Sequence, residues 1–137
     1  MANRAAIIAD RAVHLCGARY RRHGRDAVHG FDCIGLAADC LAAAGLSCAV
    51  PTGYALRGGS LDQITARLGT AGFQSLPADQ MPIGGDIVLV QPCPLQWHIM
   101  IKAGDGFVHA HAGLRRVVFA PGKSPWPIRK IFRIAED

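Results

Sequence analysis

The sequence has few charged residues and no long uninterrupted apolar run. Charged residues make up 18% of the 137 and hydrophobic residues 50%, a balance that excludes a disordered or fibrous chain and predicts a well-buried globular domain. No apolar run approaches the roughly 20 residues that a membrane-spanning helix needs, so we expect no membrane insertion. The length suits one core but not two, which predicts a single domain over residues 1–137.

The N-terminal segment lacks the continuous apolar stretch of a secretion signal. Arg4, Asp10 and Arg11 interrupt its apolar residues, and no plausible cleavage site follows. We therefore expect synthesis in the cytoplasm without a signal peptide of its own. Any action outside the cell would then depend on delivery by another machine.

The sequence also lacks a CxxC pair, and its five cysteines are odd in number. A disulfide framework uses an even number, and a structural zinc site commonly uses closely spaced cysteine pairs. Neither is expected here, and the pattern favours synthesis in a reducing compartment.

The formal charge of +5 and the pI near 9.3 favour an anionic partner. The basic residues concentrate locally in "RYRRHGR" at residues 19–25, for which a solvated loop is an equal alternative. Nucleic-acid binding has only this charge in its support, because aromatic residues are scarce at 7%. We expect no nucleic-acid partner.

Helical spacing precedes strand-like alternation along the chain. Helices are expected at residues 3–17 and 32–45 and from residue 60 onward, where apolar residues recur with helical period between capping residues. After Pro82 the pattern changes to five short β-branched or alternating runs: "GDIVLVQ", "WHIMIKA", "GFVHAHA", "LRRVVFA" and "IRKIFRI". Short turns between them favour antiparallel pairing, which predicts an α+β fold with helices packed on a sheet of five to six strands.

Cys33 occupies an unusual position in "FDCIGLAADC". With Asp32 as the N-cap, Cys33 becomes the first helical residue, where free N–H groups and the positive end of the helix dipole stabilise a thiolate. The adjacent carboxylate partly opposes this effect. A small buried hydrophobic cysteine is the competing interpretation.

Three histidines lie on the predicted strands. A thiolate mechanism needs a histidine base, and His98 opens the strand "HIMIKA" beside an irregular loop. His109 lies on the next strand, so antiparallel pairing through "GDG" would bring it close enough to orient the His98 imidazole. His111 faces the same side of that strand and is the alternative for this role.

These segments together resemble a known family. "FDCIGLAADCLAAAG" looks like the "DCSGL" helix of the NlpC-type cell-wall peptidases, and "GDIVLV" followed by "HIMIKAGDGFVHAHAG" is similar to their subsequent strands in the same order. "GARYRRHG" resembles the segment before the nucleophile, where the family places a cleft-lining tyrosine. The resemblance implies a papain-like NlpC-type fold without metal or cofactor.

The resemblance also implies a role for each matching residue. Cys33 would be the nucleophile, His98 the general base and then acid, and His109 the residue that orients His98. The oxyanion would bind the N–H of Cys33 and a neighbouring donor such as the Tyr20 hydroxyl. The complete set of candidate substrate-binding or oxyanion residues is Tyr20, Asp32, Trp97 and His111.

The implied reaction is hydrolysis of peptidoglycan stem peptides by acyl-enzyme chemistry, of the D-glutamyl-diaminopimelate endopeptidase type. Three departures from the family pattern stand out: Ile34 in place of a small serine, Trp97 before the histidine, and "HIMIK" in place of "HVGIY". None removes a catalytic group, although a bulky Trp97 would narrow the cleft. The departures therefore bear on the substrate bond more than on the chemistry.

Small stand-alone members of this kind resemble peptidases of phage or phage-derived tails. This implies phage-like tail proteins as partners and action in the periplasm or cell wall after delivery. A secreted amidase effector is one alternative function. Another is a non-catalytic tail-tip or adaptor module that retains the fold, although the presence of all three triad candidates weighs against it.

Overall fold

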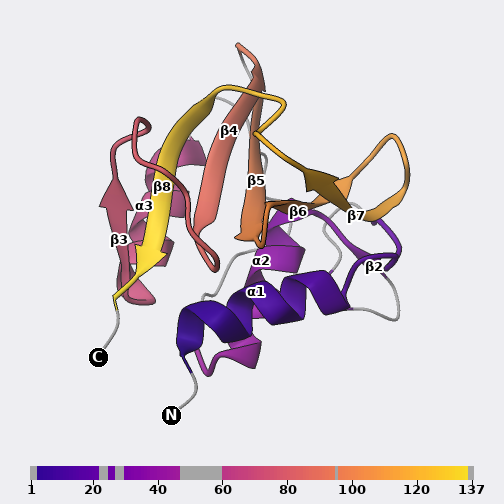
Figure 1. The fold of residues 1–137 in the computed structure, drawn as a ribbon, viewed down its shortest axis with the longest axis horizontal. Helices are drawn as coiled ribbons and strands as arrows, with labels where there is room; N and C mark the ends of the chain where they lie inside the picture. Colours follow the sequence, from indigo (N-terminus) through magenta and orange to yellow (C-terminus); the bar gives the residue numbers. More distant parts are fainter. Residues whose placement is uncertain (1–2, 22–24, 27–29, 47–59, 95, 136–137) are drawn as a thin grey trace.

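The structure, a computed structural model, describes residues 3–21, 25–26, 30–46, 60–94 and 96–135. Three helices and eight strands follow one another along this part of the chain (Figure 1). In chain order they are α1 (Arg4–His14), β1 (Arg25–Asp26), β2 (Gly30–Phe31), α2 (Cys33–Ala43), α3 (Ser60–Thr70), β3 (Phe73–Leu76), β4 (Ile87–Cys93), β5 (Gln96–Ala103), β6 (Gly106–His111), β7 (Arg116–Pro121) and β8 (Ile128–Ile134).

A six-stranded antiparallel sheet forms the centre of the fold, with strand order β3-β8-β4-β5-β6-β7. The predicted α+β class is confirmed, and all five predicted strands are present as β4 to β8. The short edge strand β3 and the two-residue strands β1 and β2 were not predicted. Each is too short for a period to be recognised, and β3 forms because it pairs with β8.

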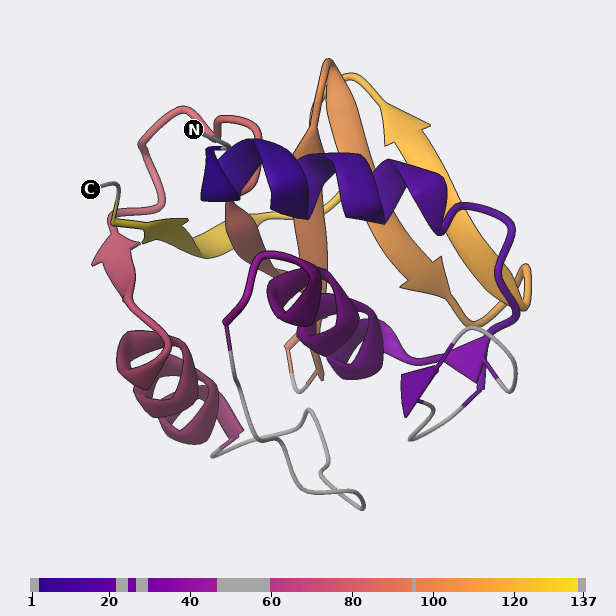
Figure 2. The same cartoon turned by 90° about the horizontal axis from the view of Figure 1, so that it is seen from below.

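The helices α1 and α2 lie side by side against one face of the sheet (Figures 1 and 2). The first helix begins as expected at Asn3, whose side chain accepts a hydrogen bond from Ala6 N–H. It ends at His14 rather than at Gly17, because Gly17 adopts a φ of 94° and donates its N–H to the Val117 carbonyl. That bond turns the chain toward the edge of the sheet.

Alternation along the central strands divides the buried side chains into two groups. One group joins the helices in the main core and includes Ile87, Leu89, Ile99, Ile101, Val108 and Ala110. The other group packs on the opposite face of the sheet, where Val88, Val90, Met100 and Phe107 meet Trp126 and Ile128. This assignment determines on which face each histidine lies.

The strands β5 and β6 separate at one end. Their pairing covers only Ile101–Ala103 and Gly106–Val108, although β5 begins at Gln96 and β6 continues to His111. Beyond this point β5 stays paired with β4, and β6 stays paired with β7. The backbone of β5 near Ile99 is therefore not used in pairing with β6.

The loop before β4 is fastened to α1 and β8. Asp86 is 1% exposed, accepts a hydrogen bond from Ile83 N–H and forms an ion pair with Arg133 at 2.9 Å. The sequence alone does not reveal this ion pair, since the two residues lie 47 positions apart. Next to it, Gly85 has a φ of 90°, and a Cβ there would come within 2.6 Å of Ala5 Cα. Only glycine therefore allows this loop to lie so close to α1.

Gly85→Ala should lower the free energy of unfolding by more than about 1 kcal/mol, since it combines a left-handed φ with a backbone clash. Gly84→Ala is the matched control, because a Cβ at Gly84 meets nothing within 4 Å and its φ is not positive. Urea denaturation of both variants measures the difference. Equal stability of the two variants would contradict the tight approach at Gly85.

Candidate active site

Cys33 is the first residue of α2, as predicted, and Asp32 is its N-cap. The Asp32 carboxylate accepts the Gly35 N–H at 2.7 Å, and the Asp32 carbonyl accepts the Leu36 N–H at 2.9 Å. The next free amides, those of Cys33 and Ile34, are directed toward the cysteine sulfur. The beginning of α2 thus surrounds Sγ with N–H groups.

Burial dominates the electrostatics of Cys33. The residue is 6% exposed, and burial raises the pKa of its thiol to about 12, with a smaller contribution from the Asp32 charge. The backbone N–H of Ile99 and the N–H groups of Cys33 and Ile34 act in the opposite direction and lower this pKa. In the absence of substrate, Cys33 is therefore a neutral thiol at neutral pH. The helix start alone does not create a resting thiolate.

The Ile99 N–H reaches Cys33 because β5 and β6 separate. An N–H that faced a paired strand would be used in the sheet, whereas Ile99 lies beyond the last β5–β6 pair at Ile101 and Val108. The N-terminal end of α2 meets β5 at this point. The predicted base, His98, is the residue of β5 that directly precedes Ile99, whose N–H acts on the candidate nucleophile Cys33.

His98 and His109 lie in direct contact. His98 Nε2 and His109 Nδ1 are 3.0 Å apart, and the two rings meet edge to face with centroids 5.1 Å apart. His98 is the partner of Val90 in the β4–β5 register, so its side chain lies on the sheet face opposite the helices. The predicted proximity of the two histidines across the "GDG" turn is thus present in the structure.

Both imidazoles are held in the neutral form. Burial, together with the smaller effects of the positive charges of protonated His109 and His111, lowers the pKa of His98 to about 3. Burial, with the charge of His111, also lowers the pKa of His109 to about 4. A neutral His98 can accept a proton at neutral pH.

In the described part of the chain, no hydrogen bond joins Cys33 Sγ to His98. Cys33 belongs to the helix-side core, whereas the His98 ring lies on the other face of the sheet. The Nδ1 atom of His98 also has no hydrogen-bond partner among the described residues, since Nε2 makes the contact with His109. Among the described residues, nothing therefore competes for this atom, the one that a thiol proton would reach.

His111 has a different partner from His109. Its Nδ1 accepts a hydrogen bond from Leu114 N–H at 3.0 Å, and its ring lies beside His109 with centroids 5.6 Å apart. The geometry therefore places His109, and not His111, against His98. Sequence reasoning had left these two alternatives open.

Trp126 completes the surroundings of the histidine pair, and sequence reasoning missed this contact. Its indole packs edge to face against His98 and against His109, each with centroids 5.5 Å apart. Two hydrogen bonds between the backbone of Trp126 and the Ser124 hydroxyl hold the residue in place. The sequence does not reveal these contacts, because the segment "SPWP" has no period that relates it to β5 or β6.

The remaining predicted site residues lie near this centre in different ways. Tyr20 and Trp97 are half-buried and pack against the main core that contains Cys33, whereas Asp32 serves as the helix cap. Cys48 and residues 22–24 of the basic cluster lie outside the described residues. Within the described chain, no group of three His, Cys, Asp or Glu side chains is placed to hold a metal ion. None of the described helices is long and apolar enough to cross a membrane.

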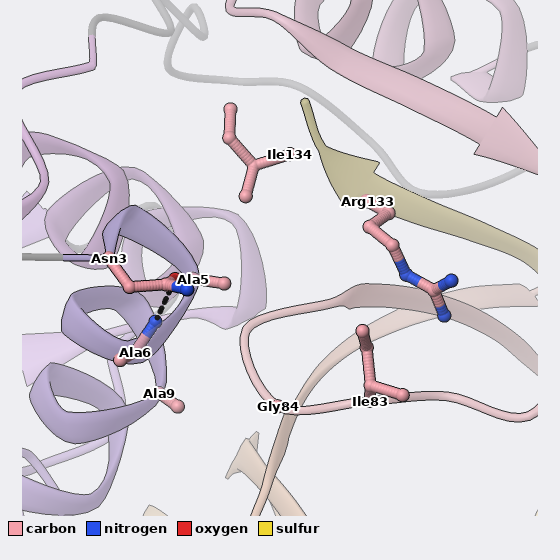
Figure 3. Close-up of a pocket in the computed structure, with 8 residues that line it drawn as sticks. All are labelled: Asn3, Ala5, Ala6, Ala9, Ile83, Gly84, Arg133 and Ile134. Carbon is pink, nitrogen blue, oxygen red and sulfur yellow. Dashed lines mark hydrogen bonds between the residues drawn. The ribbon is translucent and has the colours of Figure 1, made fainter. Parts of the chain in front are cut away.

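A pocket of about 300 Å³ lies elsewhere, between the start of α1, the loop before β4 and β8 (Figure 3). None of the predicted site residues lines it. Figure 3 shows the Arg133 guanidinium directed away from Asn3 and α1, and Arg133 is occupied by Asp86. This pocket is separate from the candidate active site.

No protein-family model matches the sequence, and no curated protein matches it. Solved structures do match the fold. NlpC1 from Trichomonas vaginalis aligns with a TM-score of 0.73 and 19% identity, over 100% of this chain and 46% of that chain. The NlpC/p60 domain of the peptidoglycan hydrolase SagA aligns with a TM-score of 0.67 and 21% identity, over 97% and 100% of the two chains.

A further match is RipD from Mycobacterium tuberculosis, with a TM-score of 0.63, 16% identity and coverage of 98% and 100%. RipD is described as a non-catalytic NlpC/p60 domain protein adapted to peptidoglycan binding. The chain spans about half the length of the two Trichomonas structures it matches. The protein therefore has the fold of the NlpC/p60 domains.

The His98 ring should stay neutral down to about pH 3, and Trp126→Ala should raise its pKa toward 6.5 by admitting water. Trp126→Phe keeps an aromatic ring and should shift the pKa less. NMR titration of the imidazole Cε1–H signals measures these values. A wild-type His98 that titrates near pH 6.5 would refute the buried neutral pair.

The same shift should appear in the pH dependence of stability. An unfolded histidine has a pKa of about 6.5, so between that pH and about 3 the unfolded state binds more protons than the folded state. The free energy of unfolding should therefore decrease as the pH falls through this range. Urea denaturation should give a weaker decrease for His98→Gln.

Proposed function

We propose that the protein is a cysteine peptidase of peptidoglycan stem peptides, with Cys33, His98 and His109 as its triad. The observation that carries this proposal is the 3.0 Å contact between His98 Nε2 and His109 Nδ1, made by the residue that precedes Ile99. Ile99 directs its N–H at the sulfur of Cys33. The contact between the two histidines and the position of His98 next to Ile99 on β5 support a base with its orienting group beside the nucleophile, as thiol chemistry requires.

The contact between the two histidines determines which ring nitrogen of each carries its proton during the reaction. For His98 to accept a proton at Nδ1, its other ring nitrogen must carry the hydrogen and donate it to His109 Nδ1. His109 then carries its own proton on Nε2. The packing of Trp126 against both rings keeps water from this hydrogen bond. His109 thus positions the base and does not itself exchange a proton with substrate.

Catalysis then follows an acyl-enzyme route. The sulfur of Cys33 attacks the peptide carbonyl while its proton passes to His98 Nδ1, and His98 returns that proton to the leaving amine. Water, deprotonated by His98, releases the acyl group and regenerates the thiol. The oxyanion binds the free N–H of Cys33 at the start of α2, with the Tyr20 hydroxyl as a second donor.

Proton transfer and attack are coupled in this site. Burial raises the pKa of Cys33 and lowers that of His98, so a separated thiolate and imidazolium are unfavourable before substrate binds. Substrate must bring the two groups together as the sulfur attacks. The resting enzyme should consequently be a poor target for alkylating reagents compared with an enzyme that holds a preformed ion pair.

The substrate class rests on the fold and on the sequence resemblance. SagA and RipB are described as peptidoglycan hydrolases, and both share this fold. The D-glutamyl-diaminopimelate bond follows from the resemblance alone. Synthesis without a signal peptide, delivery by phage-like tail proteins and action in the periplasm or cell wall likewise stay predictions from the sequence.

A second candidate function is peptidoglycan binding without catalysis. The absence of a hydrogen bond between Cys33 and His98 in the described chain favours it, as does the existence of a non-catalytic protein with this fold. Retention of all three triad residues favours the peptidase. Digestion of the wall distinguishes the two.

Purified peptidoglycan treated with the wild-type protein should release stem-peptide fragments that mass spectrometry identifies, and Cys33→Ala should release none. Cys93→Ala is the matched control, because Cys93 is exposed on β4 outside the site and should not affect the reaction. Retained binding to the wall without fragments, for wild type and variants alike, would establish the non-catalytic alternative.

His109→Ala should lower kcat by about 10²-fold or more, because it leaves His98 Nε2 without its partner. His109→Asn, which keeps an acceptor, should restore part of this loss. His111→Ala should lower kcat much less than His109→Ala does, since His111 bonds to Leu114 and not to His98. Initial rates on a stem peptide separate the three variants. If His111→Ala lowered kcat more than His109→Ala, His111 would instead be the residue that orients His98.

A further inference from the structure

Two exposed arginines face each other directly beside the histidines. Arg19 and Arg116 are partners in an isolated antiparallel bridge at the outer edge of β7. The hydrogen bonds Tyr20 N–H to Arg115 O and Val117 N–H to Ala18 O flank this pair on both sides. It is therefore a non-hydrogen-bonded pair, in which the Cα atoms are only about 4.5 Å apart and the side chains extend in the same direction.

The arrangement of two like charges is unfavourable as it stands. Like charges directly opposite each other across two strands destabilise the pair. Within the described part of the chain, neither arginine has an ion pair or a side-chain hydrogen bond to a carboxylate. The fold thus retains a repulsive pair that nothing described in the protein compensates, and a bound anion would remove the repulsion.

This pair lies on the same sheet face as the histidines. Arg116 is the register partner of His111, and Val118 is the partner of His109. The alternate residues Ala110 and Val117 face the helices instead. His98, His109, His111, Arg116 and Arg19 therefore lie on one face of the sheet, with Arg116 opposite His111 and Arg19 opposite Arg116.

His111 adds a hydrogen-bond donor between the triad and the arginines. Because its Nδ1 accepts the Leu114 N–H, the proton of the neutral ring is on Nε2. The ring is half-buried, and the register partner of His111 on β7 is Arg116. The His111 N–H and the guanidinium groups of Arg19 and Arg116 thus lie on the same face of the sheet as His98 and His109.

The backbone of Arg19 also contacts the segment that precedes Cys33. A Cβ at Gly30 would lie 2.6 Å from the Arg19 carbonyl oxygen, so β2 runs directly against Arg19. Cys33 follows Gly30 by three residues, a chain length of at most about 10 Å. The Arg19 backbone thus lies against the short segment that leads into α2 and Cys33.

We propose that Arg19 and Arg116, with His111, form a subsite for a carboxylate of the substrate one or two residues from the scissile bond. Guanidinium groups suit a carboxylate because they donate two parallel hydrogen bonds. The inference rests on the proposed peptidase function for the position of that carboxylate. It assigns substrate selection to the edge of β7, apart from the triad.

The test is titration calorimetry on the Cys33→Ala protein, which leaves the peptide intact. The probes are a stem tetrapeptide with free carboxylates and versions in which each carboxylate is singly converted to the amide. One amide should bind about tenfold more weakly than the free peptide. In Arg116→Gln and Arg19→Gln backgrounds that ratio should fall to nearly one, as expected if arginine and carboxylate interact.

Lys123→Gln is the control, since it removes one exposed positive charge from the β7–β8 loop and should keep the tenfold ratio. The Arg116→Gln variant should have an unfolding temperature equal to or above that of its parent, because a repulsion is removed. This excludes loss of the fold as the cause.

Four results would overturn the proposal: an absence of peptide binding, equal affinity for the free peptide and every amide, a ratio unchanged in the arginine variants, or arginine-dependent binding of inorganic polyphosphate alone. Hydrolysis by the wild-type protein is followed in parallel. Hydrolysis without a carboxylate preference would leave the peptidase standing and remove the subsite. Arginine-dependent binding without hydrolysis would support the subsite and remove the peptidase.

Discussion

The separation of β5 from β6 is the constraint on which the rest of the site depends. A continuous β5–β6 ladder would use the Ile99 N–H in sheet pairing, and the sulfur of Cys33 would lose this donor. The gap also lets the N-terminal end of α2 approach the sheet, so that helix amides and a strand amide converge on one atom. Helix capping and strand pairing, which are local properties, thereby combine into a site that neither creates alone.

Burial gives this site its chemical character. The sequence suggested that the helix start would activate Cys33, yet desolvation outweighs the surrounding amides and holds the thiol neutral. The same effect holds His98 and His109 neutral on the other face of the sheet. Two uncharged partners can be stored in an apolar interior at little cost, whereas a preformed ion pair would need further polar contacts.

The sequence predicted those parts of the molecule that depend on local patterns. Asp32 as a cap, Cys33 at the first helical position and the strands β4 to β8 all follow from period, capping and turn residues. The proximity of His98 and His109 followed from one short hairpin. The family resemblance supplied the fold, which the matching structures confirm.

Contacts between distant segments could not be predicted from such patterns. The packing of Trp126 against two histidines depends on how the β7–β8 connection crosses the sheet, and the Asp86–Arg133 ion pair joins residues 47 positions apart. The choice between His109 and His111 required side-chain geometry, since both face the same side of β6. The Arg19–Arg116 pair likewise appears only when the chain after α1 meets β7.

The chain after α1 has one more effect through its hydrogen bonds to β7. Gly17, Ala18 and Tyr20 occupy backbone groups of Val117 and Arg115 at the start of the outermost strand. If these backbone groups were uncovered, they could pair with a strand of another molecule. The opposite edge strand, β3, has only four residues. In the described part of the chain, the sheet is thus covered at the start of β7, and its opposite edge, β3, is short, which limits the backbone available for pairing with another molecule.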